Sequence, residues 1–223
     1  MGIAFDLHCR RCARLADFLH QVRDQYPHYH ARPVAPFGDI SGHLLIVGLA
    51  PGLHGANASG RPFTGDHAGL LLYQTLYDFG FSTNPLSRHQ NDGLRLIGCR
   101  ITNAVKCVPP QNKPETKEIH TCNAFLQAEL DSLHANGVIL ALGTIAHQAV
   151  LRAQHKKPAQ YPFAHGAVYG LDRGQRLVDS YHCSRYNTQT RRLTPAMFQE
   201  VFRQVVDLLG PAAPVGAARR RVD

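Results

Sequence analysis

The chain has 223 residues, of which 44% are hydrophobic, and its formal net charge is +8 with a pI of about 9.4. This composition excludes a disordered chain, and no apolar run approaches the ~20 residues that a membrane-spanning helix needs. The excess of positive charge favours a polyanionic partner, nucleic acid ahead of an anionic surface, although a merely basic protein without such a partner has the same charge. Six cysteines without an export signal predict a cytoplasmic protein whose thiols bind metal rather than form disulfides.

The first half of the chain is predicted to alternate helices with strands. Apolar residues spaced by three and four predict a helix over residues 8–25, followed by a proline-containing loop. The apolar run 43–49 predicts a buried strand, after which a long glycine-rich loop leads into a helix over residues 66–79. Residues 94–102 predict a second buried strand.

The second half repeats this alternation. A helix is expected to open at Pro114, followed by a strand over residues 137–142 and a helix through Leu151. Residues 155–175 are expected to be irregular, with a short strand near Ala167, before a fourth strand over residues 176–181 and a last helix capped by Thr194. The pattern predicts an α/β class fold, a three-layer α/β/α sandwich around a four-stranded, mainly parallel sheet. A single domain is expected over residues 1–209, with a disordered basic tail over residues 210–223.

Four cysteines are candidate metal ligands. Cys9 and Cys12 form a C-x-x-C pair, and Cys107 and Cys122 lie far along the chain beside rigid elements. Four such thiolates can hold zinc or a 4Fe–4S cluster. The alternative is that Cys107 and Cys122 are small core residues, as free cysteines often are. Cys99 is expected in the core.

Three further side chains follow predicted strands at the edge where open α/β sheets bind ligands. Phe63 lies in the glycine-rich loop, where it could stack on an exposed base or fold back onto the sheet. Asn103 could pair with a base edge or cap a loop. His182 could donate to an oxyanion, move a proton or serve the structure alone. The loop lacks the lysine of a P-loop and the G-x-G-x-x-G pattern, which argues against ordinary nucleotide binding.

Several segments together resemble the uracil-DNA glycosylase superfamily, most closely its family 5 and next its family 4. They are GLAPGLHGANASGRPFTGD, ITNAVKCVPPQNKP and HCSRYNTQTRRLT, with CRRC near the start and ELDSLHANGVILALGTIAHQAVL between. The resemblance spans most of residues 9–205. It implies a structural 4Fe–4S cluster held by Cys9, Cys12, Cys107 and Cys122.

The resemblance also assigns roles in base recognition. Phe63 is expected to stack on a flipped base, Asn103 to read its edge, and His182 to bond the base oxygen that gains charge. The minor-groove loop that it implies comprises Ser184, Arg185, Tyr186 and Asn187. Cys183 stands where the family usually has proline, a departure that affects this loop.

The second departure concerns water activation. Ala50 occupies the position where most of the superfamily carries Asp, Asn or Glu, and an alanine there is characteristic of family 5. Asn57 matches the residue proposed to position water in that family, although a neutral amide can only orient water and not act as a base.

The resemblance implies a monomeric DNA-repair hydrolase that flips uracil out of DNA and cleaves its N-glycosidic bond, leaving an abasic site. The same family pattern extends the expected substrates to hypoxanthine and ethenocytosine. Three alternatives remain: a family 4-like enzyme restricted to uracil, a non-catalytic iron–sulfur DNA-binding module suggested by Ala50, and a zinc-stabilised module.

Overall fold

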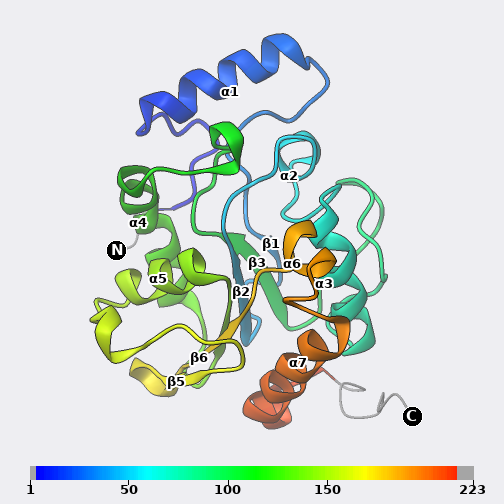
Figure 1. The fold of residues 1–223 in the computed structure, drawn as a ribbon, viewed down its shortest axis with the longest axis vertical. Helices are drawn as coiled ribbons and strands as arrows, with labels where there is room; N and C mark the ends of the chain where they lie inside the picture. The colour runs from blue at the N-terminus through cyan, green and yellow to red at the C-terminus, as the bar shows by residue number, and fades with distance from the viewer. Residues whose placement is uncertain (1–3, 215–223) are drawn as a thin grey trace.

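The computed structural model describes residues 4–214 and shows one sheet with helices on both faces (Figure 1). The strand order is β1-β3-β2-β4-β6-β5. Its four inner strands are parallel: β3 (Cys99–Asn103), β2 (Leu44–Gly48), β4 (Val138–Leu142) and β6 (Arg176–Ser180). The predicted α/β class is confirmed, and the four predicted strands form the parallel centre of the sheet.

The predicted strand count was wrong at both edges. β1 (Phe37–Gly38) and β5 (Val168–Gly170) pair antiparallel with β3 and β6, which makes the sheet six-stranded. Strands of two and three residues are too short for an alternating pattern to stand out in sequence. The short strand expected near Ala167 is β5, and it extends the sheet.

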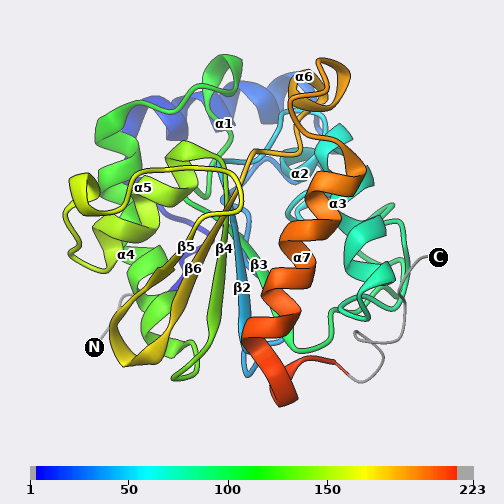
Figure 2. The same cartoon turned by 60° about the horizontal axis from the view of Figure 1, so that its bottom comes forward.

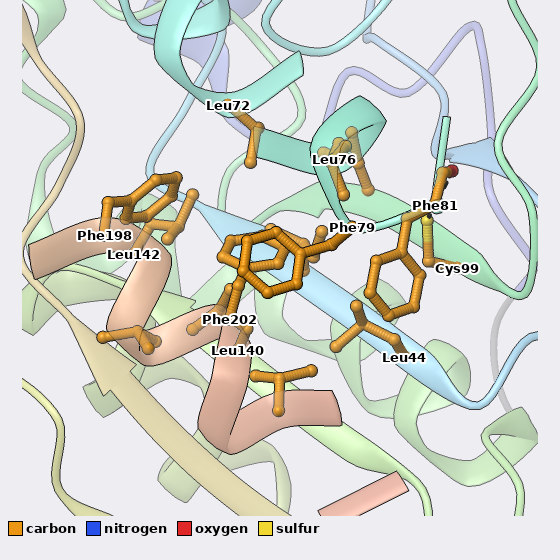
Figure 3. Packing of buried hydrophobic residues seen from close by; sticks show 14 of the residues in the cluster. Leu44, Leu72, Leu76, Phe79, Phe81, Cys99, Leu140, Leu142, Phe198 and Phe202 are labelled. Atoms are coloured by element: carbon orange, nitrogen blue, oxygen red, sulfur yellow. Dashed lines mark hydrogen bonds between the residues drawn. The ribbon is translucent and has the colours of Figure 1, made fainter. Parts of the chain in front are cut away.

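Two hydrophobic layers separate the sheet from its helices, and β2 supplies both. Leu44 and Ile46 pack on one face with α3 (His67–Asp78) and α7 (Pro195–Leu209), while Leu45 and Val47 pack on the other. That second face is covered by α4 (Thr116–Ser132) and α5 (Thr144–Ala153). Figure 2 shows these helix pairs on opposite sides of the sheet, and Figure 3 shows the side chains of the first layer. Because successive strand residues point to opposite faces, one continuous apolar run builds both layers.

Several element boundaries differ from the prediction. The first helix, α1 (Ala13–Gln25), begins after the C-x-x-C pair rather than at residue 8, and β3 begins five residues later than expected. The long loops contain two short helices that the sequence did not indicate, α2 (Ala56–Ser59) and α6 (Arg185–Gln189). Gly210–Ala212, at the start of the predicted tail, forms a 3-10 turn, and residues 215–223 of that tail lie outside the described residues. Three more 3-10 turns are Pro110–Asn112, Pro158–Gln160 and Asp172–Gly174.

Helix α1 lies across the carboxyl ends of the strands, on the same edge of the molecule as α6 (Figure 2). Its buried residues Leu15 and Leu19 join a third hydrophobic cluster with Val105 and Phe125. Arg14 anchors the helix to α4 by bonds of 2.8 and 2.7 Å to the Glu118 carboxylate. In the described part of the chain, no helix has the length and apolar character needed to cross a membrane.

Candidate active site

A cavity of about 470 Å³ opens where the parallel strands end, and it gathers most of the predicted site residues other than the cysteines. Its lining includes Ala50, Phe63, Asn103 and His182, which come from three separate strand ends. Ser184 and Arg185, from the start of α6, form part of its rim. The structure therefore brings together residues that are distant in sequence, as the ligand-binding edge of an open α/β sheet requires.

Gly48 allows the ring of Phe63 and the side-chain amide of Asn103 to meet. A Cβ atom there would lie 2.4 Å from Asn103 Oδ1 and 2.6 Å from Phe63 Cζ. Phe63 is 6% exposed with a positive φ of 57°, so the loop holds its ring in the cavity wall at a backbone geometry that non-glycine residues seldom adopt. Asn103 pairs with Gly48 in the β2–β3 register. Within residues 4–214 no partner bonds its side-chain amide, which leaves that amide available to a ligand.

His182 faces Phe63 across the cavity. The two ring centroids are 6.0 Å apart at an interplanar angle of 27°. Burial lowers the pKa of His182 to about 4, so its imidazole is neutral at pH 7 and has one N–H to donate. Asn187 Nδ2 donates to the His182 carbonyl oxygen at 2.8 Å, and Ser184 Oγ accepts from the Asn187 backbone N–H at 3.3 Å. The short helix α6 thus fixes the backbone that carries the histidine.

Asp66 is the functional candidate that sequence reasoning missed. It lines the same cavity, and its Oδ2 accepts from the Ala56 backbone N–H at 3.0 Å. A Cβ at Gly52 or Gly55 would lie 2.3 or 1.9 Å from Asp66 Oδ1, so two glycines form the cradle for this carboxylate. Burial raises the pKa of Asp66 above its usual value, which makes it a stronger base than a surface carboxylate. Asp66 is also the N-cap residue of α3, but its side chain makes no cap bond to that helix.

Two other lining residues were also absent from the prediction. Asn112 is exposed and has a positive φ of 57° in the turn after Pro110, and the buried Nδ1 of His67 has no hydrogen-bond partner among the described residues. The proline-bounded loop around Asn112 was the only signal in sequence for the first. Nothing in the sequence distinguished His67 from other histidines.

Asn57 occupies a different place from the other predicted residues. It is fully buried in α2, outside the cavity lining, and its Nδ2 donates to the Leu53 carbonyl oxygen at 3.3 Å. Its Oδ1 is buried without a hydrogen-bond partner in the described chain. That oxygen can accept a bond from water, so orienting water stays a prediction for Asn57.

The four candidate ligand cysteines converge beneath α1. Cys9, Cys12, Cys107 and Cys122 all line one enclosed space of about 20 Å³ and belong to the cluster that contains Leu15 and Phe125. Burial raises the pKa of Cys122 to about 11 and that of Cys107 further. The Lys106 backbone N–H donates to Cys122 Sγ at 3.3 Å. Within residues 4–214, no set of three or more His, Cys, Asp or Glu is arranged around a single metal ion. Cys99 lies in the core, as predicted, and so does Cys183.

A buried lysine connects the cysteine group to the cavity wall. Lys106 is 1% exposed, and its Nζ donates to the Asn103 carbonyl oxygen at 3.0 Å and to Glu129 Oε1 at 2.7 Å. It also bonds the Thr102 hydroxyl. A buried charge needs such a paired and bonded environment, so the end of β3 is held to α4 at the point where Asn103 enters the cavity.

Fold and site together define an α/β protein with a cavity of about 470 Å³ at the carboxyl edge of its sheet, and comparisons with known proteins place it in a family. The family model described as "Uracil DNA glycosylase superfamily" matches residues 35–206. A type-5 uracil-DNA glycosylase of Thermus thermophilus is 44% identical over 91% of this chain and 94% of its own length. Another from Mycobacterium leprae is 43% identical over 91% of this chain and 92% of its own, and a type-4 enzyme of Archaeoglobus fulgidus is 28% identical over 92% and 90%.

The chain belongs to the uracil-DNA glycosylase superfamily. The resemblance inferred from the sequence motifs is confirmed, including the order in which type-5 proteins precede type-4 proteins. The roles of individual residues stay predictions.

Proposed function

We propose that this chain is a uracil-DNA glycosylase that hydrolyses the N-glycosidic bond of a uracil flipped out of DNA. Superfamily membership and the similarity to type-5 uracil-DNA glycosylases support the activity. The observation that carries the proposal is the convergence of Phe63, Asn103 and His182 on one cavity. An aromatic platform, an amide and a neutral imidazole are together suited to hold one extruded base.

Each side chain has a defined task in the proposed reaction. Phe63 stacks on the base, and the Asn103 amide pairs with its edge. As the bond between the base nitrogen and C1′ breaks, both electrons leave with the base, and His182 donates a hydrogen bond to the oxygen that becomes negative. Water adds to the electron-poor C1′ and loses a proton. The product is an abasic site with a hydroxyl at C1′.

Asp66 is the carboxylate placed to receive that proton. Its Oδ1 has no partner among residues 4–214, whereas Oδ2 is held by the Ala56 backbone N–H. The small Ala50 side chain leaves the cavity without a carboxylate at its own position. We therefore assign water activation to Asp66, with Asn57 as an orienting residue behind the loop.

The cavity size supports a wider range of bases than uracil. A cavity of about 470 Å³ with alanine at position 50 has room for a purine such as hypoxanthine and for ethenocytosine. A uracil-restricted activity, as in a type-4 enzyme, is the alternative. The acting unit in this proposal is a monomer.

The four clustered cysteines fit a 4Fe–4S cluster in the proposal. Their thiols share one space, lie in an apolar surrounding and have no disulfide partner. Cys9, Cys12, Cys107 and Cys122 would hold such a cluster, because thiolates are the ligands that iron–sulfur clusters take. The cluster, when bound, supplies a structural crosslink rather than chemistry on the base.

Ser184 to Asn187 form the proposed DNA-binding loop. Tyr186 is 70% exposed on α6, and Arg185 is exposed at the cavity rim. An exposed ring beside a cation is suited to enter the minor groove and fill the gap left by the flipped nucleotide.

The proposal is tested by excision from duplexes that contain uracil, hypoxanthine or ethenocytosine, with abasic sites revealed by alkali cleavage. The parent protein is expected to cleave the uracil duplex. His182→Ala is expected to be slower by about 10²–10³-fold, the usual cost of losing one donor to a developing anion. His120→Ala, an exposed histidine on α4, is the matched control and should match the parent. A parent protein that binds these duplexes without forming abasic sites would establish the non-catalytic alternative.

A further inference from the structure

A second cavity lies beneath α1 and carries a concentration of positive charge that the excision chemistry does not use. It has a volume of about 280 Å³, and its lining includes Arg10, Arg23 and Arg32 with Leu19 and Pro33. None of its described lining residues is acidic. We call it the arginine cavity. Guanidinium groups present forked N–H donors that match phosphate oxygens, and three around one concavity form an anion site.

The guanidinium groups of the arginine cavity have few partners inside the protein. Within the described chain, Arg10 and Arg32 are exposed and have no ion-pair or hydrogen-bond partner. Arg23 uses one nitrogen, Nη1, which donates to the Ala31 carbonyl oxygen at 2.8 Å. An internal counter-ion therefore does not neutralise the site, and an external anion can.

The backbone that presents Arg32 is held in place. Its neighbour Ala31 is fully buried with a positive φ of 41°, a conformation that a non-glycine residue keeps only where its surroundings fix it. The Ala31 N–H donates to the Asn57 carbonyl oxygen at 3.0 Å, and its carbonyl accepts from Arg23. Arg32 is therefore positioned by two bonds, one of them to the glycine-rich loop.

The arginine cavity and the active-site cavity belong to one side of the molecule. Leu19 lines the first and Ala50 the second, and both residues belong to the same hydrophobic cluster. Figure 2 shows α1 and α6 along the same edge of the molecule, above the carboxyl ends of the strands. A duplex seated with its flipped nucleotide over the active site would extend along this edge.

We propose that the arginine cavity binds a backbone phosphate of the DNA strand flanking the flipped nucleotide. This inference rests on the proposed function for the identity of the polyanion. Phosphate contacts carry no sequence information, but they set the position of a protein on the duplex. The contact would hold the DNA at a second point, away from the flipped base.

The experiment measures Kd as a function of salt for an undamaged duplex and for one that contains an abasic-site analogue. Arg32→Gln removes the charge and keeps a polar side chain that can still donate hydrogen bonds. It is expected to weaken binding to both duplexes by the same factor and to make the slope of log K against log salt shallower by about 0.9, the value of one phosphate contact. Arg10→Gln should act in the same direction.

The matched control is Arg152→Gln. Arg152 is exposed, has no ion-pair or hydrogen-bond partner within residues 4–214, and lies in the last turn of α5, outside the lining of both cavities. The DNA affinity of Arg152→Gln and its slope of log K against log salt should equal those of the parent. Thermal melting checks that each variant is folded, and Arg10→Gln and Arg32→Gln provide independent readings if one of them destabilises the chain.

Slopes equal to that of the parent in both variants would refute the phosphate contact. Titration with inorganic phosphate distinguishes a small anion as ligand: binding that Arg32→Gln abolishes, with an unchanged DNA slope, overturns the DNA assignment. A parent protein that fails to excise uracil but shows the slope changes would refute the glycosylase proposal and leave this contact standing. Uracil excision by the parent, with salt slopes unchanged in both variants, would support the glycosylase proposal and refute the phosphate contact.

Discussion

At the scale of single residues, the site depends on small side chains as much as on polar ones. Gly48 lets Asn103 and Phe63 meet, and Gly52 and Gly55 leave room for Asp66. These contacts explain why the loop after β2 is rich in glycine although it does not have the pattern of a phosphate-binding loop. Its glycines make space for side chains rather than for a bound phosphate.

Asp66 gives the residue-scale prediction, a change in the pH profile of excision. Because burial raises its pKa, the ionised form that accepts a proton from water is lost at a higher pH than for an exposed carboxylate. The single-turnover rate of the parent should therefore rise with pH through this raised pKa and then level off. Asp66→Asn should lose that rise and be slower by about 10²-fold or more.

The stability of Asp66→Asn distinguishes a role of Asp66 in water activation from a purely structural role. A carboxyl whose pKa is raised in the folded state stabilises the fold below its unfolded pKa, and that contribution is lost as pH rises through the folded pKa. Asp66→Asn should thus be at least as stable as the parent at neutral pH. Asp131→Asn, at an exposed acid of α4, is the control. Full activity with an unchanged profile in Asp66→Asn would remove Asp66 from the mechanism.

At the scale of elements, α6 has two tasks in five residues. Its N-cap, Ser184, and its residue Asn187 fix the carbonyl of His182. Its exposed Tyr186 points away from the core, at 70% exposure. The helix is too short to be stable alone, so its caps and the preceding strand β6 must hold it.

Tyr186→Ala is expected to slow excision of uracil from duplex DNA by roughly tenfold or more, while excision from single-stranded DNA changes little, because only the duplex must be opened and kept open. The melting temperature should be almost unchanged, since the side chain packs on little. The measurement compares single-turnover rates on the two substrates. Gln189→Ala, exposed on the same helix, is the control, and equal losses on both substrates would contradict a role in opening the duplex.

At the scale of the whole molecule, the cysteine group ties the start of the chain to its centre. Cys9 and Cys12 precede α1, whereas Cys107 follows β3 and Cys122 lies within α4. A cluster at this point would crosslink segments about a hundred residues apart, which restricts the unfolded chain strongly. It would also hold α1, with the arginine cavity, against the glycine-rich loop.

The corresponding prediction concerns cofactor content and stability. Purified protein should be brown and contain about four irons per chain with matching sulfide. Cys122→Ser should lose iron and melt at a lower temperature, because metal ligands contribute binding energy to the fold. Cys183→Ser, at a fully buried thiol outside the group, should keep its iron. A colourless parent with stoichiometric zinc would establish the zinc-stabilised alternative.

Local sequence patterns were enough for the class of fold and for three of the residues that face the cavity. The apolar runs of β2, β4 and β6 are continuous because both faces of each strand are buried, and such runs stand out without any tertiary information. Phe63, Asn103 and His182 were found because each follows a strand or lies in the loop that leaves one. The edge strand β1 and the helices α2 and α6 were missed because two to five residues carry too weak a periodic signal.

The amino-acid sequence by itself determined the superfamily, the parallel centre of the sheet and the candidacy of Phe63, Asn103 and His182 at its carboxyl edge. Only the tertiary structure decided that Asp66 turns into the cavity instead of capping α3, that Asn57 lies behind the loop, and that three arginines share one concavity under α1. The reason is physical. Hydrophobic periodicity is encoded along the chain, whereas the direction of a polar side chain depends on the space that distant residues leave for it.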